Sequence, residues 1–387
     1  MPQNKGPKQY QPLNAVRKKL RIKWYRSPID KEILRELTLK SDFKGWVQAG
    51  GHLAVFLLTG IITYLFWSLG LWWAFLAALF CHGTVSSFLM GNAPHELGHG
   101  TVFRSRKLNK IFLHLFSLIS WWDPFDYAVS HTYHHRYTMY PEADRENVFP
   151  LEPSLNPFLL IQLFSINLFS SAGRVFGKGG LFSTIYLTFL SAMGKTRSKD
   201  IPSQEWLQSL LDDQPEEHLK STWWSRTLLF FHGSLLIFSI ASGLWVLALI
   251  ISFPAFIANW ASYFTGLTQH CGLKDNNSDF RKSTRTIKLN PILQFLYWHM
   301  NWHIEHHMYA GVPCYNLKKL HSLVADDMPP PRTLFEAWKE MRQIWKRQQN
   351  DQDYQFETEV PDLQIISNSA EDHLTTSIGD LAPNALR

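Results

Sequence analysis

Two long blocks without charged side chains dominate the pattern of hydrophobic and polar positions along this chain. The first runs from Gly45 to His95 and the second from Thr227 to Leu273, although 18% of all residues are Asp, Glu, Lys or Arg. A helix crosses the hydrocarbon core of a bilayer with about 20 apolar residues, so each block has room for two spans and a tight turn. The pattern predicts an integral membrane protein, even though the mean hydropathy of −0.15 taken alone suggests a soluble one.

Turn-forming residues divide each block into two. Ser68 to Leu71 mark a turn in the first block, and Ser242 with Gly243 marks one in the second. We therefore predict an all-α membrane protein with four transmembrane helices in two hairpins and a helical cap. Pro254 should kink the last helix. The predicted spans are residues 50–69, 71–91, 227–242 and 244–266.

The charged segments around these blocks suggest three parts of the chain. Residues 1–46 hold twelve Lys or Arg against four Asp or Glu, and Ile29 to Leu37 show the spacing of a short amphipathic helix at a membrane surface. Residues 47–348 form the predicted membrane domain. A capping box at Thr333 and Glu336 predicts an amphipathic helix near its end. The polar, aperiodic residues 349–387 are predicted to be a disordered tail.

Basic residues predict the orientation in the membrane. They cluster before and after each charge-free block, as at Arg17 to Lys23 and Arg104 to Lys110, whereas the turns inside the blocks carry no charge. The positive-inside rule then places both termini and the long middle segment in the cytoplasm. The net charge of +6 favours contact with anionic membrane lipids. No nucleic-acid partner is expected.

Seventeen histidines include three clusters that lie just outside the charge-free blocks, on the predicted cytoplasmic side. Residues three and four apart share one face of a helix, so each cluster can direct its imidazoles to one point. One further histidine lies at the cytoplasmic end of the last predicted span. The candidate metal ligands are His95 and His99, His131, His134 and His135, His270, and His303, His306 and His307.

The number of candidate ligands predicts the number of metals. Nine imidazoles exceed the six or so ligands that one first-row ion accepts, so two metals are implied. The predicted fold is therefore completed by a cytoplasmic helical cap that holds a dimetal site. Imidazole suits iron, copper, zinc and nickel, and ligand type alone does not choose among them. A pair of zinc ions would normally include carboxylate ligands. A pair of copper ions bound by histidines is an alternative site for reactions with oxygen.

Two other functions share some of these features. His95 to His99 also fit the H-E-x-x-H pattern of zinc proteases, which would leave two clusters unexplained. A metal transporter would place its ligands deep within the apolar blocks, where, away from the block ends, only His52, His82 and His232 lie. For these three, and for His114 and His321, packing is the expected role, and it is slightly favoured for His299. Candidate carboxylates that could orient ligands are Glu96, Glu305, Asp123, Asp126, Asp144 and Asp275.

The three histidine boxes resemble those of the membrane-bound fatty acid desaturase and hydroxylase superfamily. The likeness covers about residues 30–348, in the order hairpin, two boxes, hairpin, third box, and includes the context from Asn301 to Tyr309 followed by Pro313. It implies that the predicted membrane domain, residues 47–348, is the catalytic domain. It implies a non-haem di-iron centre, with two Fe ions per chain, that uses O2 and electrons to attack an unactivated C–H bond of a lipid acyl substrate. It also implies that His270 is a ligand.

Three departures limit what the resemblance implies. His303 stands where front-end desaturases carry Gln, and Gly266 stands where some acyl desaturases carry an Asn that contacts a metal through water. No His-Pro-Gly-Gly motif of a fused cytochrome b5 domain occurs, so an external electron donor of ferredoxin or cytochrome b5 type is expected. Hydroxylases of lipids, alkanes or carotenoids in the same superfamily remain the alternative to a desaturase.

Overall fold

Among the residues that the structure describes, three helical stretches are long and apolar enough to cross a membrane, namely Asp42–Ser68, Trp72–Gly98 and Pro215–Ala241. They belong to a mostly helical computed structural model that describes residues 10–147, 151–169, 180–196, 202–351 and 353–361. The first stretch comprises α3 (Asp42–Gly45), a π-helical turn (Trp46–Gly50) and α4 (Gly51–Ser68). The second comprises α5 (Trp72–Ser87) and α6 (Asn92–Gly98), and the third is α12 (Pro215–Ala241).

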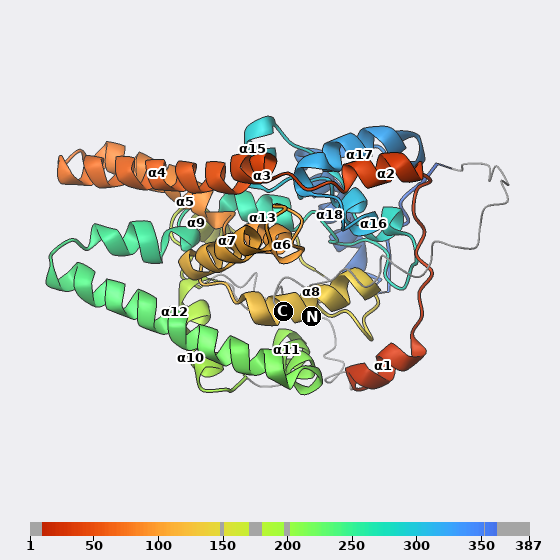
Figure 1. Ribbon diagram of the computed structural model, residues 1–387, viewed down its shortest axis with the longest axis horizontal. Helices are drawn as coiled ribbons and strands as arrows, with labels where there is room; N and C mark the ends of the chain where they lie inside the picture. Colours follow the sequence, from red (N-terminus) through yellow and green to blue (C-terminus); the bar gives the residue numbers. More distant parts are fainter. Residues whose placement is uncertain (1–9, 148–150, 170–179, 197–201, 352, 362–387) are drawn as a thin grey trace.

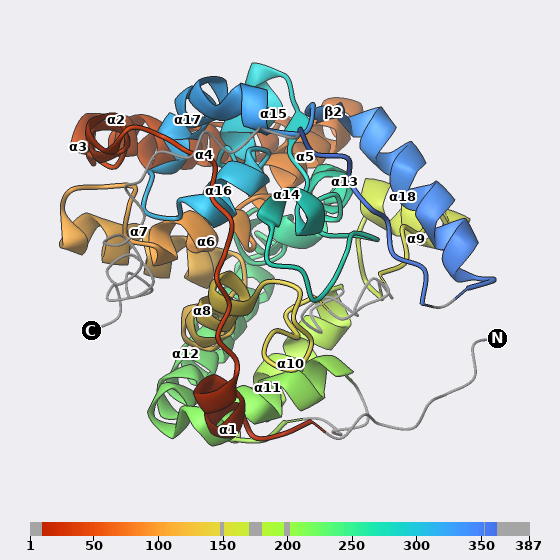
Figure 2. The same cartoon turned by 90° about the vertical axis from the view of Figure 1, so that its right-hand side faces the viewer.

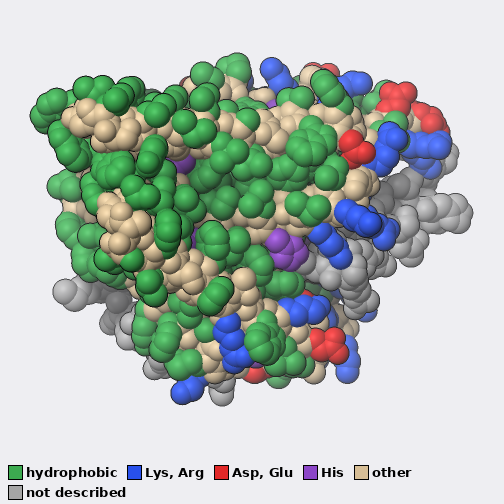
Figure 3. Space-filling view, turned by 60° about the vertical axis from the view of Figure 1, so that its left-hand side comes forward, with side chains coloured by type: hydrophobic (Ala, Val, Ile, Leu, Met, Phe, Trp, Pro, Cys, Tyr) green, Lys and Arg blue, Asp and Glu red, His purple; other side chains and the backbone are tan. Residues whose placement is uncertain are grey.

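The first predicted hairpin is confirmed. α4 and α5 pack against each other along their length and are joined by a turn in which Gly70 adopts a φ of 69°. Apolar side chains such as Leu58 and Ile61 on α4 are more than half exposed. Figure 3 shows this side of the molecule covered largely by hydrophobic side chains, with charged ones gathered toward the right and lower edges. An outward-facing apolar surface of this kind suits contact with lipid.

The second block folds differently from the first. α12 begins at Pro215, twelve residues before the predicted start, with Glu216 and Glu217 in its first turn. In place of one kinked helix over residues 244–266, three short pieces follow: a π-helix (Ala248–Ser252), a 3-10 helix (Pro254–Phe256) and α13 (Trp260–Gly266). Proline lacks an N–H and clashes with the preceding turn, so Pro254 ends the helical hydrogen bonding.

Close backbone contact holds this broken segment against α5. A Cβ on Gly83 would lie 2.2 Å from the carbonyl oxygen of Ile257, so only glycine fits there. The ring of His82 contacts the carbonyl oxygen of Ile250 at 2.9 Å, and the Thr84 hydroxyl donates to the carbonyl of Ala258 at 3.1 Å. Backbone groups released by the break at Pro254 are thereby satisfied from a neighbouring helix.

A cap of shorter helices lies at one end of these long helices, on the right of Figure 1. Two short parallel strands, β1 (Ile287–Lys288) and β2 (Arg332–Thr333), tie its last part together. The other helices are α1 (Leu13–Lys19), α2 (Lys31–Leu37), α7 (Arg106–Ile119), α8 (Pro124–Tyr137), α9 (Pro157–Phe164), α10 (Leu181–Ala192), α11 (Pro202–Asp213), α14 (Phe280–Ser283), α15 (Pro291–Leu296), α16 (His303–Met308), α17 (Leu317–Val324) and α18 (Leu334–Gln348), with 3-10 turns at Cys314–Asn316 and Ala325–Asp327.

Two helices predicted from local sequence signals are confirmed. α18 begins after Thr333, whose side chain accepts from the Glu336 N–H, while the Glu336 side chain accepts from the Thr333 N–H. α2 begins after Asp30, whose carboxylate accepts from two backbone N–H groups. Both helices thus begin where a side chain satisfies N–H groups that the helix itself leaves unpaired.

The largest hydrophobic core joins α5, α6 and α7 to the segment that carries the third histidine box. Phe88, Phe103 and Trp298 are fully buried in it. The Trp298 indole donates to the His52 ring on α4 at 2.9 Å. Figure 2 looks at the cap end and shows α16 above α6 and beside α14, with α8 below α6. The core therefore holds the histidine-bearing helices together.

Part of the predicted tail contacts the cap. The Glu357 carboxylate accepts from the ammonium groups of Lys274 and Lys282, and Phe356 forms a β-bridge with Leu273. Residues 362–387, which make up most of the predicted disordered tail, lie outside the described residues.

Candidate metal centre

Three short helices and one turn present the nine predicted histidines. α6 carries His95, with His99 as its C-terminal cap residue. α8 carries the second box and begins after Asp123, whose carboxylate accepts from two backbone N–H groups, with Pro124 at the first helical position. α16 carries the third box, and His270 lies in the turn after α13. Capping and proline therefore fix where α8 starts and which way its histidines face.

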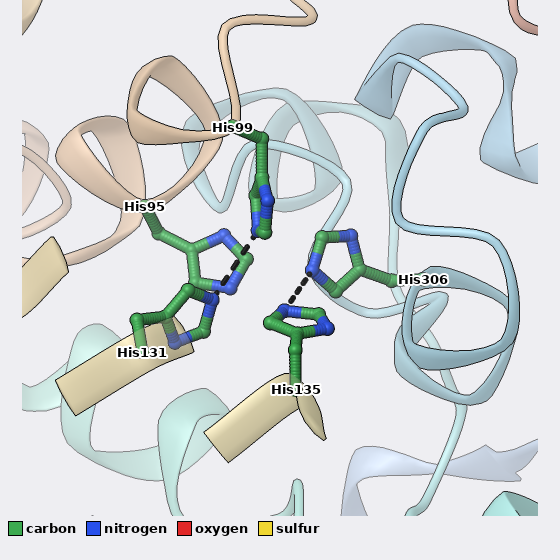
Figure 4. Close-up of side chains that lie close together, drawn as sticks. All are labelled: His95, His99, His131, His135 and His306. Carbon is green, nitrogen blue, oxygen red and sulfur yellow. Dashed lines mark hydrogen bonds between the residues drawn. The ribbon is translucent and has the colours of Figure 1, made fainter. Parts of the chain in front are cut away.

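The nine histidines form two groups, and in each group the ligand atoms lie within 4.8 Å of one another. Figure 4 shows the five rings of the first group converging from α6, α8 and α16. Most of the nine side chains are buried, and His99 and His135 are partly exposed. The first group is His95, His99, His131, His135 and His306, and the second is His134, His270, His303 and His307.

The second and third boxes each divide between the two groups, which corrects the expectation that every box points to one place. On α8, His131 and His135 are four residues apart and face one group, while His134 faces the other. Adjacent helical residues point about 100° apart, so neighbouring histidines separate. α8 and α16 therefore each contribute to both groups and hold them side by side.

Ring nitrogens within each group face one another at short range. In the first group, Nε2 of His131 lies 3.2 Å from Nε2 of His99. In the second, Nε2 of His303 lies 3.1 Å from that of His270 and 3.2 Å from that of His307. Imidazole nitrogens bind zinc at about 2.0–2.1 Å, so two ligands at right angles around such an ion lie about 3 Å apart.

The opposite nitrogen of several rings contacts an oxygen atom. Nδ1 of His134 lies 2.9 Å from Asp144, and Nδ1 of His270 lies 2.9 Å from the carbonyl oxygen of Ser283. Nδ1 of His95 lies 3.0 Å from Glu96. An N–H at Nδ1 that donates to oxygen leaves the Nε2 lone pair for a metal, which is how histidine ligands are commonly oriented.

At His134, burial lowers the pKa, but the carboxylates of Asp144 and Glu146 outweigh it and raise the value to about 9. For most of the other imidazoles, burial favours the neutral form, which binds metals. It lowers the pKa of His131, His135, His303 and His307 well below the usual value, and neighbouring histidines lower it further. These rings are therefore neutral at pH 7. Neutral imidazole is the form that acts as a ligand.

Buried carboxylates surround the two groups. Burial raises the pKa of Asp144, but His134 and two backbone N–H groups outweigh it and hold the value below normal. Burial raises the pKa of Glu146 to about 7, and this carboxyl lies 3.3 Å from Nδ1 of His131. Glu96 contacts both His95 and, at 3.6 Å, Nδ1 of His306. Of these groups, Asp144 has its pKa held below the usual value, so it places a negative charge beside His134 that favours cation binding.

Comparison with known families agrees with this geometry. Residues 70–338, more than half of the chain, match the model of the fatty acid desaturase family. The chain belongs to the fatty acid desaturase family. It is thus a membrane oxidoreductase of a di-iron family, and its two histidine groups suit a dimetal site. A comparison with curated proteins finds no match.

The other carboxylates that the sequence suggested as groups orienting the ligands contact residues other than the nine histidines. Glu305 is fully buried and contacts the Thr286 hydroxyl at 2.7 Å and the His321 ring at 2.5 Å. Glu305 therefore ties α16 to Thr286 and to His321 of α17. Asp123 caps α8 and accepts from Ser221, and Asp275 accepts from Gln355. Asp126 lies in the first turn of α8.

Within the described part of the chain, the remaining histidines lie outside both groups. His52 contacts Trp298 and the carbonyl oxygen of Val85, and His232 contacts Ser252 and the carbonyl of Leu118. These contacts are those of packed, hydrogen-bonded side chains, as expected. His114 contacts a carbonyl oxygen of its own helix. His82 contacts the Thr59 hydroxyl on α4 and the carbonyl oxygen of Ile250. His299 is mostly buried, with a φ of 58°.

Several residues that the sequence did not identify contact the second box, either directly or through Glu146. Ser130 donates to Glu146 at 3.0 Å and accepts from the Trp206 indole of α11 at 2.9 Å. Tyr127, one turn before His131, contacts Nδ1 of that ring at 3.2 Å. Helical spacing could have identified Tyr127. The position of Trp206, 76 residues from Ser130, follows only from the tertiary fold.

A cavity of about 590 Å³ opens beside both histidine groups. It is lined by His95 and His131 of the first group, by His270 and His303 of the second, and by Leu163 of α9 among its apolar residues. Its volume is in the range of small-molecule binding sites. A molecule in this cavity would lie against both groups.

Proposed function

We propose that this protein is a lipid acyl desaturase in which the nine grouped histidines hold two iron ions. Membership in the fatty acid desaturase family supports the reaction class. The single observation that carries the assignment to these residues is that nine histidines from all three boxes and the turn after α13 meet in two adjacent groups. His95 and His99 share a group with three more histidines, which a protease site with one further ligand would not need.

The residues fit the proposed ions in number and chemistry. Nε2 of His95 is buried and has no hydrogen-bond partner among the described residues, and it belongs to a group of five ring nitrogens. An unpartnered lone pair of this kind is costly unless something binds it. Two groups of four and five imidazoles also match the coordination that one ion each accepts.

Two bound irons, supplied with dioxygen and electrons, would provide the oxidant needed to remove hydrogen from a methylene group. The chain's own contribution is positional. Asp144, Glu146 and Glu96 orient imidazoles through Nδ1, and the cavity beside both groups holds the acyl chain away from bulk water. Electrons would come from an external ferredoxin or cytochrome b5 type donor.

Hydroxylation is the second outcome that such a site supports. It differs from desaturation after the first hydrogen is removed, and the difference depends on how closely the substrate is placed. We expect desaturation on the strength of the family. Mass spectrometry of lipids from a host that expresses the gene should show products lighter by two mass units. Products heavier by sixteen mass units would instead show a hydroxylase.

Metal analysis of the purified protein tests the metals directly. We expect about two irons per chain, because two separate groups each provide four or more imidazoles. Removal of iron by a chelator should abolish oxygen consumption, and added iron should restore it. Copper in place of iron, or zinc alone with no oxygen consumption under any reductant, would contradict the proposal.

We also propose that the chain crosses the membrane four times with both termini and the metal centre in the cytoplasm. The broken segment over residues 244–266 then makes the fourth crossing, packed against α5. Reporter fusions at Leu69 and Gly243 should report the non-cytoplasmic side, because both turns lie between uncharged segments with basic flanks. A cytoplasmic signal at either position would contradict this topology.

A further inference from the structure

His270 lies in a buried turn between α13 and α14, outside any helix or strand. Thr268, His270 and Cys271 are each at most 2% exposed. A turn lacks the regular hydrogen-bond partners of a helix, so its buried carbonyl oxygens need donors from elsewhere in the fold. Gly272, in the same turn, adopts a φ of 77°, a conformation that favours glycine. The position of the His270 ring therefore depends on the groups that hold this turn.

The Arg285 guanidinium contacts the turn on both sides of His270. Its Nη1 donates to the carbonyl oxygen of Thr268 at 2.5 Å, and its Nη2 donates to that of Cys271 at 3.2 Å. The Arg285 backbone N–H also donates to the carbonyl oxygen of Gln269 at 2.9 Å. The side chain is fully buried. A guanidinium is planar and directs its N–H groups in fixed directions, so it sets the spacing of the oxygens that accept from it.

Glu340 of α18 fixes the direction of the Arg285 side chain. Its Oε1 accepts from Nε of Arg285 at 2.9 Å and from Nη2 at 2.8 Å. A buried guanidinium without a partner would be costly, and its charge would repel a cation bound nearby. The Glu340 carboxylate offsets that charge. α18 also packs directly on the turn, because a Cβ on Gly272 would lie 2.8 Å from the Ile344 side chain.

The residue after Arg285 holds the helix that faces His270. The Thr286 hydroxyl donates to Glu305 of α16 at 2.7 Å. α16 also carries His303, whose Nε2 lies 3.1 Å from Nε2 of His270. Two consecutive residues, Arg285 and Thr286, thus hold the His270 turn and α16 in place relative to each other.

We propose that Arg285 is a positioning residue for the second group, in which it holds Nε2 of His270 where that atom can bind a metal. Glu340 orients Arg285 for this role. A salt bridge that only stabilised the fold would not need the two carbonyl contacts on either side of His270. The inference rests on the proposed function and adds two residues to its site. The first group contains no residue of this turn, so the effect of Arg285 falls on the second group.

Arg285→Met tests this inference through iron binding. Methionine removes the donors and keeps an unbranched side chain that can fill the buried space. Bound iron per chain would be measured against rising chelator concentration. One of two irons should be lost at about tenfold lower chelator concentration than in the unchanged protein, and the other should be retained as before. A general loosening of the fold would weaken both irons, because α8 and α16 contribute to both groups.

Arg332→Met is the matched control. Arg332 pairs with the other oxygen of Glu340, Oε2, at 3.1 Å, and so bonds the same carboxylate instead of the turn. This variant should hold both irons as tightly as the unchanged protein. Equal chelator sensitivity of Arg285→Met and Arg332→Met would overturn the inference and leave the proposed function intact. An equal loss of both irons in Arg285→Met would do the same.

Arg285→Lys decides the question if the methionine variant does not fold. Lysine keeps the positive charge beside Glu340, but its single ammonium lacks the planar fork that reaches two carbonyls and a carboxylate. One iron should again be held less tightly, and the other should be unaffected. Two irons held as in the unchanged protein would overturn the inference. An unchanged protein that binds no iron would instead overturn the proposed function, on which the inference rests.

Discussion

His270→Ala is expected to reduce product formation by more than about 100-fold and to lower the iron content of the purified protein. Nε2 of His270 lies 3.1 Å from that of His303, and its Nδ1 is held by the carbonyl oxygen of Ser283. The second group has only four histidines, so the loss of one leaves three ring nitrogens. Iron content and product yield should be measured together at matched expression.

His114→Ala is the matched control for this variant. The His114 ring contacts the carbonyl oxygen of Lys110 on its own helix and lies outside both groups. The control should retain both irons and nearly full activity. Full iron loading with near-normal turnover in His270→Ala would remove His270 from the site and leave a centre of eight histidines.

Asp144→Asn should lower iron affinity and activity by about 10- to 100-fold, the usual effect of losing a group that orients a metal ligand. The Asp144 carboxylate accepts from Nδ1 of His134 at 2.9 Å and from the backbone N–H groups of Met139 and Glu146. An amide keeps the shape but loses the negative charge and one acceptor atom. His134 would then be held less firmly, and its Nε2 would be a weaker ligand.

Chelator competition and turnover assays check this prediction, with Asp275→Asn as the control. Asp275 follows the proposed ligand His270 by five residues in the sequence. Its carboxylate accepts from Gln355, and it lies outside the two groups. The control should match the unchanged protein in both assays. The same iron affinity in Asp144→Asn as in the control would show that Asp144 does not orient a ligand.

The sequence by itself determined the features that depend on neighbouring residues. A charge-free block and a Gly-containing turn are local properties, and they predicted the α4–α5 hairpin. Helical spacing identified the three boxes, and the Thr333–Glu336 capping box identified the start of α18. In each case the physical cause, side-chain hydrophobicity or a backbone N–H that needs an acceptor, acts within a few residues.

Only the tertiary structure decided how these parts combine. The division of α8 between two groups depends on which helices face His134 and His135, and the contacts of Trp206 with Ser130 and of Glu146 with His131 depend on how the cap folds back. Likewise, Pro254 predicted a kink, but the shape of the broken segment depends on α5, where Gly83 admits the carbonyl of Ile257. Such contacts join residues far apart in sequence, and their energy depends on packing that no local pattern encodes.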